Sequence, residues 1–166
     1  MKQQLFSARG RFALMVCLAS VLGAAVGEQR ASAQQGQGVY VTQASARLTK
    51  LITAANKYKY KLADNSFSIG GGWLKQSKTK WVPLFTVKLE AGVDYRFLAA
   101  GDNDARDVDL DIRDPDGNTV AVDDKTDPEA VVNYSPTKTG IYTVRIRLYE
   151  SQDNLPCVCL AIMMVK

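Results

Sequence analysis

The sequence contains no histidine, and this absence removes several kinds of active site at once. A serine or cysteine nucleophile activated by histidine, a zinc site of the HExxH type and any transition-metal centre held by imidazole all need that side chain. Carboxylate chemistry stays available, because the chain carries 17 aspartates and glutamates. We therefore expect a protein that is not an enzyme, with a carboxylate-based hydrolase as the remaining catalytic alternative.

Long apolar runs are scarce, and the one at the N-terminus has the form of a secretory signal peptide. Basic residues precede an apolar run over residues 12–26, and Ala31-Ser32-Ala33 offers a small-residue cleavage site ahead of Gln34. The run is short for a membrane span, and no later stretch approaches that length. We expect residues 1–33 to be removed, which leaves residues 34–166 as a secreted or periplasmic protein without a membrane span.

Basic charge is in small excess, at +4, and residues 1–33 account for three of these charges. The near-neutral remainder gives no reason to expect a nucleic-acid partner. Charge is nevertheless segregated, since residues 47–88 hold nine basic residues against one acidic, and residues 90–129 hold thirteen acidic against four basic. Such surfaces either face each other or are solvated, and the alternative is an acidic face that binds cations or a basic partner.

Cysteine is also rare, and only Cys157 and Cys159 lie outside the expected signal peptide. Two residues apart on an extended strand, they point to the same face. Export makes a disulfide between them a candidate, although a bridge between such near neighbours is strained, so buried free thiols are the alternative. Their apolar neighbours argue against the exposed site that thiol exchange needs.

The segment after the cleavage site predicts a polar leader and then one amphipathic helix over about residues 41–60. Its apolar residues recur at spacings of three and four, which places them on one stripe that packs on the rest of the domain. The stripe consists of Val41, Ala44, Leu48, Leu51, Ile52, Ala55, Tyr58 and Leu62. Alternation of tyrosine and lysine over residues 57–61 is also compatible with the start of a strand. We assign residues 34–66 to the leader and helix and residues 67–166 to the β region, with Gly70-Gly71-Gly72 as a break that marks the passage between them.

The clearest β element is a hairpin over residues 106–124, with a turn at residues 114–118 that holds a proline and a glycine. Apolar and acidic side chains alternate along its first arm. The apolar face holds Val108, Leu110 and Ile112, the acidic face Asp107, Asp109 and Asp111, and the second arm Val120 and Val122.

Further alternating segments follow from residue 81 to residue 149, and residues 157–165 are apolar on both faces. That last segment predicts a strand with the sandwich core on one side and the N-terminal helix on the other. Seven or eight short strands separated by turns predict a mainly β fold, an antiparallel, jelly-roll-like β-sandwich with one N-terminal amphipathic helix.

Four segments resemble the bacterial pre-peptidase C-terminal domain family over roughly residues 74–150. They are residues 85–95, 107–112, 116–118 and 139–144. The resemblance implies an exported, jelly-roll-like β-sandwich, and it implies no activity of its own. Some members of the family are thought to bind collagen or other polymers, sometimes with calcium. In this chain the segments stand without a peptidase and follow only a helix.

The acidic hairpin also raises the question of calcium, which takes six to eight hard oxygen ligands. The candidate ligands are Asp107, Asp109, Asp111, Asp114 and Asp116. The simpler interpretation makes the first three a solvated strand face and the last two part of the turn. We predict a non-catalytic binding or structural accessory protein whose partner is an exported protein or an extracellular polymer, with a calcium-dependent binding module as the alternative.

Overall fold

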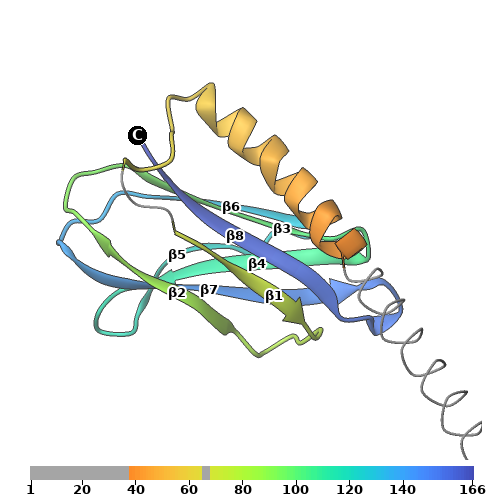
Figure 1. The fold of residues 1–166 in the computed structure, drawn as a ribbon. Coiled ribbons are helices and arrows are strands. Elements are labelled where there is room, and N and C mark those ends of the chain that lie inside the picture. Colours follow the sequence, from red (N-terminus) through yellow and green to blue (C-terminus); the bar gives the residue numbers. More distant parts are fainter. Residues whose placement is uncertain (1–37, 65–67) are drawn as a thin grey trace, which may run out of the picture. The chain divides into compact units, whose positions relative to one another are not determined.

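The computed structural model describes residues 38–64 and 68–166, so the expected signal peptide and its cleavage site lie outside it. Residues Val39–Lys166 form one compact unit, in which a helix accompanies two sheets (Figure 1). No helix within the described residues combines the length and the apolar character that a membrane crossing requires.

The two sheets contain four strands each and are antiparallel throughout. The strands are β1 (Ile69–Leu74), β2 (Val82–Leu89), β3 (Tyr95–Gly101), β4 (Ala105–Arg113), β5 (Thr119–Asp123), β6 (Glu129–Tyr134), β7 (Gly140–Ser151) and β8 (Cys157–Val165). One sheet has the order β1-β8-β3-β6 and is named the covered sheet, and the other has the order β2-β7-β4-β5 and is named the open sheet. Each strand of the first half of the chain pairs with one of the second half, and the partners become closer in sequence from one pair to the next, as in a jelly roll. The pairs are β1-β8, β2-β7, β3-β6 and β4-β5. The predicted antiparallel β-sandwich is confirmed.

Two hydrophobic layers hold this unit together. The main core lies between the sheets, where Phe97, Leu110 and Ile146 are fully buried. A second core lies on the other side of the covered sheet, where Ile162 and Met164 pack with the helix. Strand β8 contributes to both cores, which confirms its predicted burial on two faces and explains its continuous apolar sequence.

The helix spans residues 38–56 of the described chain and lies along the covered sheet (Figure 1). Leu48 and Ala55 are buried in the second core, which confirms the predicted packing for the middle of the stripe, whereas Val41, Tyr58 and Leu62 at its ends are exposed. The predicted end at residue 60 is wrong, because Lys59 has a φ of 68° that stops the helix. Tyr60 then folds back into the second core, with the guanidinium carbon of Arg96 4.2 Å from its ring centroid.

The three consecutive glycines do not interrupt the β structure, and the prediction of a break is wrong. All three lie within β1, where Gly71 is paired with Leu160 of β8. A Cβ atom on Gly71 would lie 2.3 Å from the carbonyl oxygen of Cys159. Glycine is therefore needed because the backbones of the two strands approach closely, and not because the chain turns.

The hairpin of β4 and β5 is confirmed, and Gly117 adopts the left-handed conformation of its turn, with a φ of 84°. The second arm differs from the prediction, because the register shifts between Ile112 and Arg113. Val122 consequently pairs with Asp111 on the outer face and is 48% exposed, so it does not continue the apolar face of Val108, Leu110 and Ile112. A bulge reverses the side to which alternate residues point, which the alternation itself does not reveal.

Candidate functional site

Three aspartates of β4 form a row on the outer face of the open sheet. Asp107, Asp109 and Asp111 expose only 3%, 1% and 2% of their surface. The expectation of a solvated acidic face is therefore wrong. These side chains alternate with the core residues as predicted, but long side chains from the neighbouring strand cover them.

Two of the three aspartates are neutralised by arginines of β7, which runs antiparallel beside β4. Arg145 donates from Nε to Asp111 Oδ1 at 2.8 Å and from Nη2 to Asp111 Oδ2, so this pair is bidentate. Arg147 donates from Nε to Asp109 Oδ2 at 2.6 Å. Cross-strand register places each arginine directly opposite its aspartate. The paired charges account for the burial of these two carboxylates.

The arginines also alternate with aromatic rings, and this arrangement is named the ladder. The guanidinium carbon of Arg147 lies 4.6 Å from the ring centroid of Trp81 and 4.8 Å from that of Tyr149. The guanidinium carbon of Arg145 lies 5.2 Å from the ring centroid of Trp81, and the ammonium nitrogen of Lys78 lies 5.0 Å from the ring centroid of Tyr149. Arg147 also donates to the carbonyl oxygen of Lys78 at 2.8 Å. Such contacts hold the arginines in place and fix the surface above the aspartates.

Asp107 differs from its two neighbours, because no arginine stands opposite it. The register shifts between Asp107 and Val108, so that Asp107 is paired with Glu150 and Tyr149 is the extra residue of a bulge. Its Oδ1 atom is buried and has no hydrogen-bond partner among the described residues. Burial, and then the negative charge of Asp109, raise the pKa of Asp107 from 3.8 to about 6.

A cleft of about 300 Å³ opens at Asp107. Its lining consists of Asp107, Asp109, Asp124, Thr126, Arg147 and Tyr149. Three carboxylates thus face one guanidinium that is already paired with Asp109. Since opposite charge is favoured in such a site, the cleft is suited to a positively charged group.

Replacing Asp107 by asparagine is expected to stabilise the folded protein by about 1–2 kcal/mol at pH 7.5, after allowance for screening at the cleft mouth. The folded-state pKa of about 6 exceeds the unfolded value of 3.8, so ionisation of Asp107 opposes folding. This penalty is absent below about pH 4 and complete above about pH 6. Chemical denaturation of both proteins at pH 4 and pH 7.5 measures it. An equal difference at the two pH values would contradict the assignment, and Asp116→Asn, in the exposed turn, is the control.

The five calcium candidates do not come together at one point. Asp114 lies in the turn about 20 Å along the hairpin from Asp107. The backbone N–H of Asn118 donates to its Oδ1 atom at 2.7 Å, and this bond lowers the pKa of Asp114. Asp116 is exposed in the same turn. Within residues 38–64 and 68–166, no three carboxylates or thiols are arranged to hold a metal ion.

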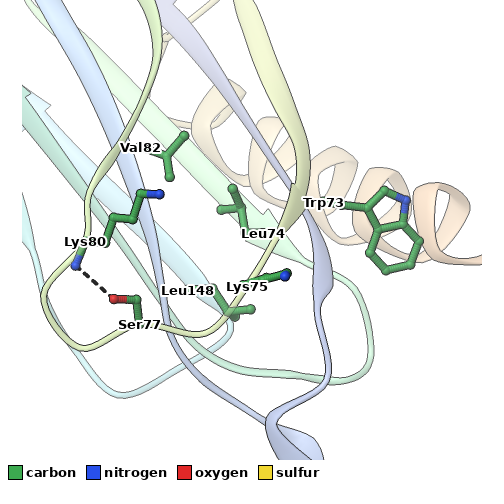
Figure 2. A pocket seen from close by; sticks show the side chains of 7 residues that line it. All are labelled: Trp73, Leu74, Lys75, Ser77, Lys80, Val82 and Leu148. Atoms are coloured by element: carbon green, nitrogen blue, oxygen red, sulfur yellow. Dashed lines mark hydrogen bonds between the residues drawn. The ribbon is translucent and has the colours of Figure 1, made fainter.

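A second cavity, of about 250 Å³, lies where the edges of β1 and β2 separate (Figure 2). Leu74, Val82 and Leu148 contribute aliphatic side chains to it, and Lys75 and Lys80 contribute amino groups. Figure 2 shows Trp73 turned away from these side chains. This cavity contains no carboxylate, and we assign no chemistry to it.

Cys157 and Cys159 point to the same face, as predicted, and both lie in the core between the sheets. In the structure both are free thiols. Burial, and then the charge of Asp102, raise the pKa of the Cys157 thiol to about 12, and burial also raises that of Cys159. These thiols are poorly suited to exchange, which proceeds through the thiolate.

The ladder residues were not among the predicted site residues. A signal for them is present in the sequence, because Arg145 and Arg147 alternate along one strand in the same way as Asp109 and Asp111 along another. Recognising it requires knowing that β4 and β7 are neighbours, although about 35 residues separate the paired side chains.

Comparison with family models and with curated proteins does not identify the protein that carries this site. No family model matches the sequence, and no curated protein matches it. The resemblance to the pre-peptidase C-terminal domain therefore stays a prediction.

Proposed function

We propose that this protein is an exported, non-catalytic binding or structural accessory protein that acts through the outer face of the open sheet. The observation that carries the proposal is the carboxylate of Asp107, which lines a cleft and whose buried Oδ1 atom has no hydrogen-bond partner among the described residues. An unpaired buried polar atom lowers stability, and such groups with raised pKa values cluster at functional sites. Another exported protein or an extracellular polymer is the partner.

The surroundings of Asp107 favour binding because the cleft is already formed. Arg147 is held by Asp109, by two aromatic rings and by the carbonyl oxygen of Lys78. A ligand would therefore meet a wall whose side chains need little reordering, which reduces the entropy lost on binding. The jelly roll supports this face through the strands β4 and β7, which are the inner strands of the open sheet.

Export is supported by the N-terminal sequence. Basic residues, an apolar run and the small residues before Gln34 follow the order of a secretory signal peptide. N-terminal sequencing of the protein recovered from outside the cytoplasm should begin at Gln34, and recovery of the intact chain from the cytoplasm alone would contradict export.

The binding proposal can be tested with a photo-crosslinking amino acid at Thr126, which is exposed at the cleft lining. After irradiation in the native envelope and secreted fractions, we expect a discrete adduct with one exported macromolecule. A matched variant carries the same amino acid at Lys50, which is exposed on the helix. Identical adducts from the two positions, or none from Thr126, would count against the open sheet as the binding face.

A calcium-dependent binding module is the second candidate, because Asp107 and Asp124 both line the cleft and offer hard oxygen ligands. Excess calcium would then raise the thermal midpoint relative to EDTA, as expected of a ligand that binds the folded state. A carboxylate-based hydrolase is the third candidate, and it would show turnover of a polymer that Asp107→Asn abolishes.

A further inference from the structure

The outer face of the open sheet repeats one recognition unit twice. In each unit an aspartate of β4 accepts hydrogen bonds from the arginine opposite it on β7, as in Asp111 with Arg145 and Asp109 with Arg147. Each guanidinium also lies near an aromatic ring. The third aspartate, Asp107, continues the row without the cation that completes the unit.

The bulge in β7 accounts for the missing cation. Where the regular register would continue, Tyr149 is the extra residue and Glu150 is paired with Asp107. Asp107 is thus surrounded by further negative charge, from Asp109, Glu150 and Asp127, with Arg147 as the opposing charge. Bulges commonly redirect side chains beside functional sites. The result is an aromatic side chain and an unpaired carboxylate at the same cleft.

We infer that the cleft binds the guanidinium group of an arginine side chain on a partner polypeptide, with Asp107 as its carboxylate acceptor. This inference rests on the proposed function of the same face and names its ligand. The bound arginine would complete the third unit of the row. Its N–H groups would donate to the Asp107 carboxylate, which lines the cleft and whose Oδ1 atom has no hydrogen-bond partner among the described residues.

A guanidinium fits the cleft better than a metal ion or an ammonium. A calcium ion needs six to eight converging oxygen ligands, and no group of three acidic residues in the described chain converges in this way. An ammonium is compact and strongly hydrated, whereas a guanidinium is planar, loses its water more readily and stacks on aromatic rings. The ring of Tyr149 already contacts both the guanidinium of Arg147 and the ammonium of Lys78, so the planar shape and weaker hydration of the guanidinium are what favour it here.

Binding should also depend on pH, because the acceptor must be ionised. Burial and neighbouring acids raise the pKa of Asp107 to about 6, so affinity for a guanidinium should rise between pH 5 and pH 7.5. The charged or titratable groups that face it are Asp109 of β4, Arg147, Tyr149 and Glu150 of β7, and Asp124 and Asp127 of the segment between β5 and β6.

The test uses three capped peptides, Gly-Arg-Gly, Gly-Lys-Gly and Gly-citrulline-Gly, titrated into the full chain and followed by the amide signals of the cleft residues. Citrulline has the shape of arginine without its charge. We expect Gly-Arg-Gly to bind most tightly, and Asp107→Asn to weaken it about tenfold or more, as loss of a charged hydrogen-bond partner does. Asp116→Asn, an exposed acid at the far end of the hairpin, should leave binding unchanged.

The other outcomes overturn either the inference or the proposed function, each in a distinct way. Equal binding of arginine and citrulline peptides, or equal loss in the two variants, would show that Asp107 is not a guanidinium acceptor. Calcium binding that depends on Asp107, without arginine binding, would assign the cleft to a metal. If no peptide binds while the crosslinker at Thr126 still captures a partner, the ligand class is wrong and the binding face stands. If the arginine peptide binds but no crosslinked partner is found, the ligand class stands and the proposed function fails.

Discussion

Replacing Arg147 by methionine is expected to lower the free energy of unfolding by about 3–5 kcal/mol at pH 7, the range found when one partner of a buried ion pair is removed. The change leaves the Asp109 carboxylate, which is 1% exposed, without the guanidinium that neutralises it. It also removes two cation–aromatic contacts and a hydrogen bond to the carbonyl oxygen of Lys78. Urea denaturation at pH 7 measures the loss.

The pH dependence separates this cause from a simple loss of packing. Burial already raises the pKa of Asp109, and Arg147 opposes that shift, so the variant should raise the pKa further. The destabilisation should be largest at pH 7 and smaller at pH 4, because a protonated Asp109 has no charge to neutralise. The double variant Asp109→Leu with Arg147→Met should recover most of the stability. Equal losses at both pH values without recovery in the double variant would contradict the proposed pairing.

Replacing Gly71 by alanine is expected to lower the free energy of unfolding by about 2–3 kcal/mol, as overpacking does in a rigid surrounding. The added Cβ atom would lie 2.3 Å from a backbone oxygen of β8 and 2.7 Å from Leu160 Cδ2. The backbone cannot move aside without separating β1 from β8. Urea denaturation measures the decrease in the free energy of global unfolding, and hydrogen exchange of the β1 amides shows whether the strand detaches locally.

Gly72→Ala is the matched control for this change. Gly72 lies in the same strand with the same φ of 159°, but its Cβ atom would meet nothing within 4 Å. The two alanine variants therefore share any backbone effect, and their difference reports the close approach of the strands alone. Equal stability of the two would contradict the register of β1 against β8.

Elements with a strong local pattern were predictable from the sequence. The hairpin turn was recognised from its proline and glycine, and β8 from an apolar run on both faces. The helix stripe containing Leu48 and Ala55 was recognised from its spacing. In each case the residues that determine the element lie within one short window, so neighbouring strands need not be known.

Features that depend on strand neighbours were not predictable. The glycines of β1 look like a break until Gly71 is seen against the backbone of β8. The outward position of Val122 follows from a bulge that leaves no mark in the alternation. The row of aspartates looks solvated until β7 places Arg145 and Arg147 over it. Pairing between neighbouring strands of the same sheet determines all three.

The same row explains why Asp107 could be named as a candidate from the sequence while its difference from the other acidic residues could not be seen. Alternation with apolar residues identified Asp107, Asp109 and Asp111, the turn added Asp114 and Asp116, and oxygen chemistry suggested calcium. The structure separates them into two neutralised carboxylates, two turn residues and Asp107, whose Oδ1 atom has no hydrogen-bond partner in the part of the chain that the structure describes. Charge pairing, which the sequence does not display, distinguishes Asp107 from the others.

The most direct measurement is the pKa of Asp107, obtained from the carboxyl carbon signal in an NMR pH titration with and without the arginine peptide. An unpartnered, buried acceptor should titrate near pH 6 in the free protein, and its pKa should fall when the guanidinium binds, because the opposite charge favours the carboxylate. A value near 3.8 that the peptide does not change would contradict both the unpaired state of Asp107 and its role as the binding carboxylate.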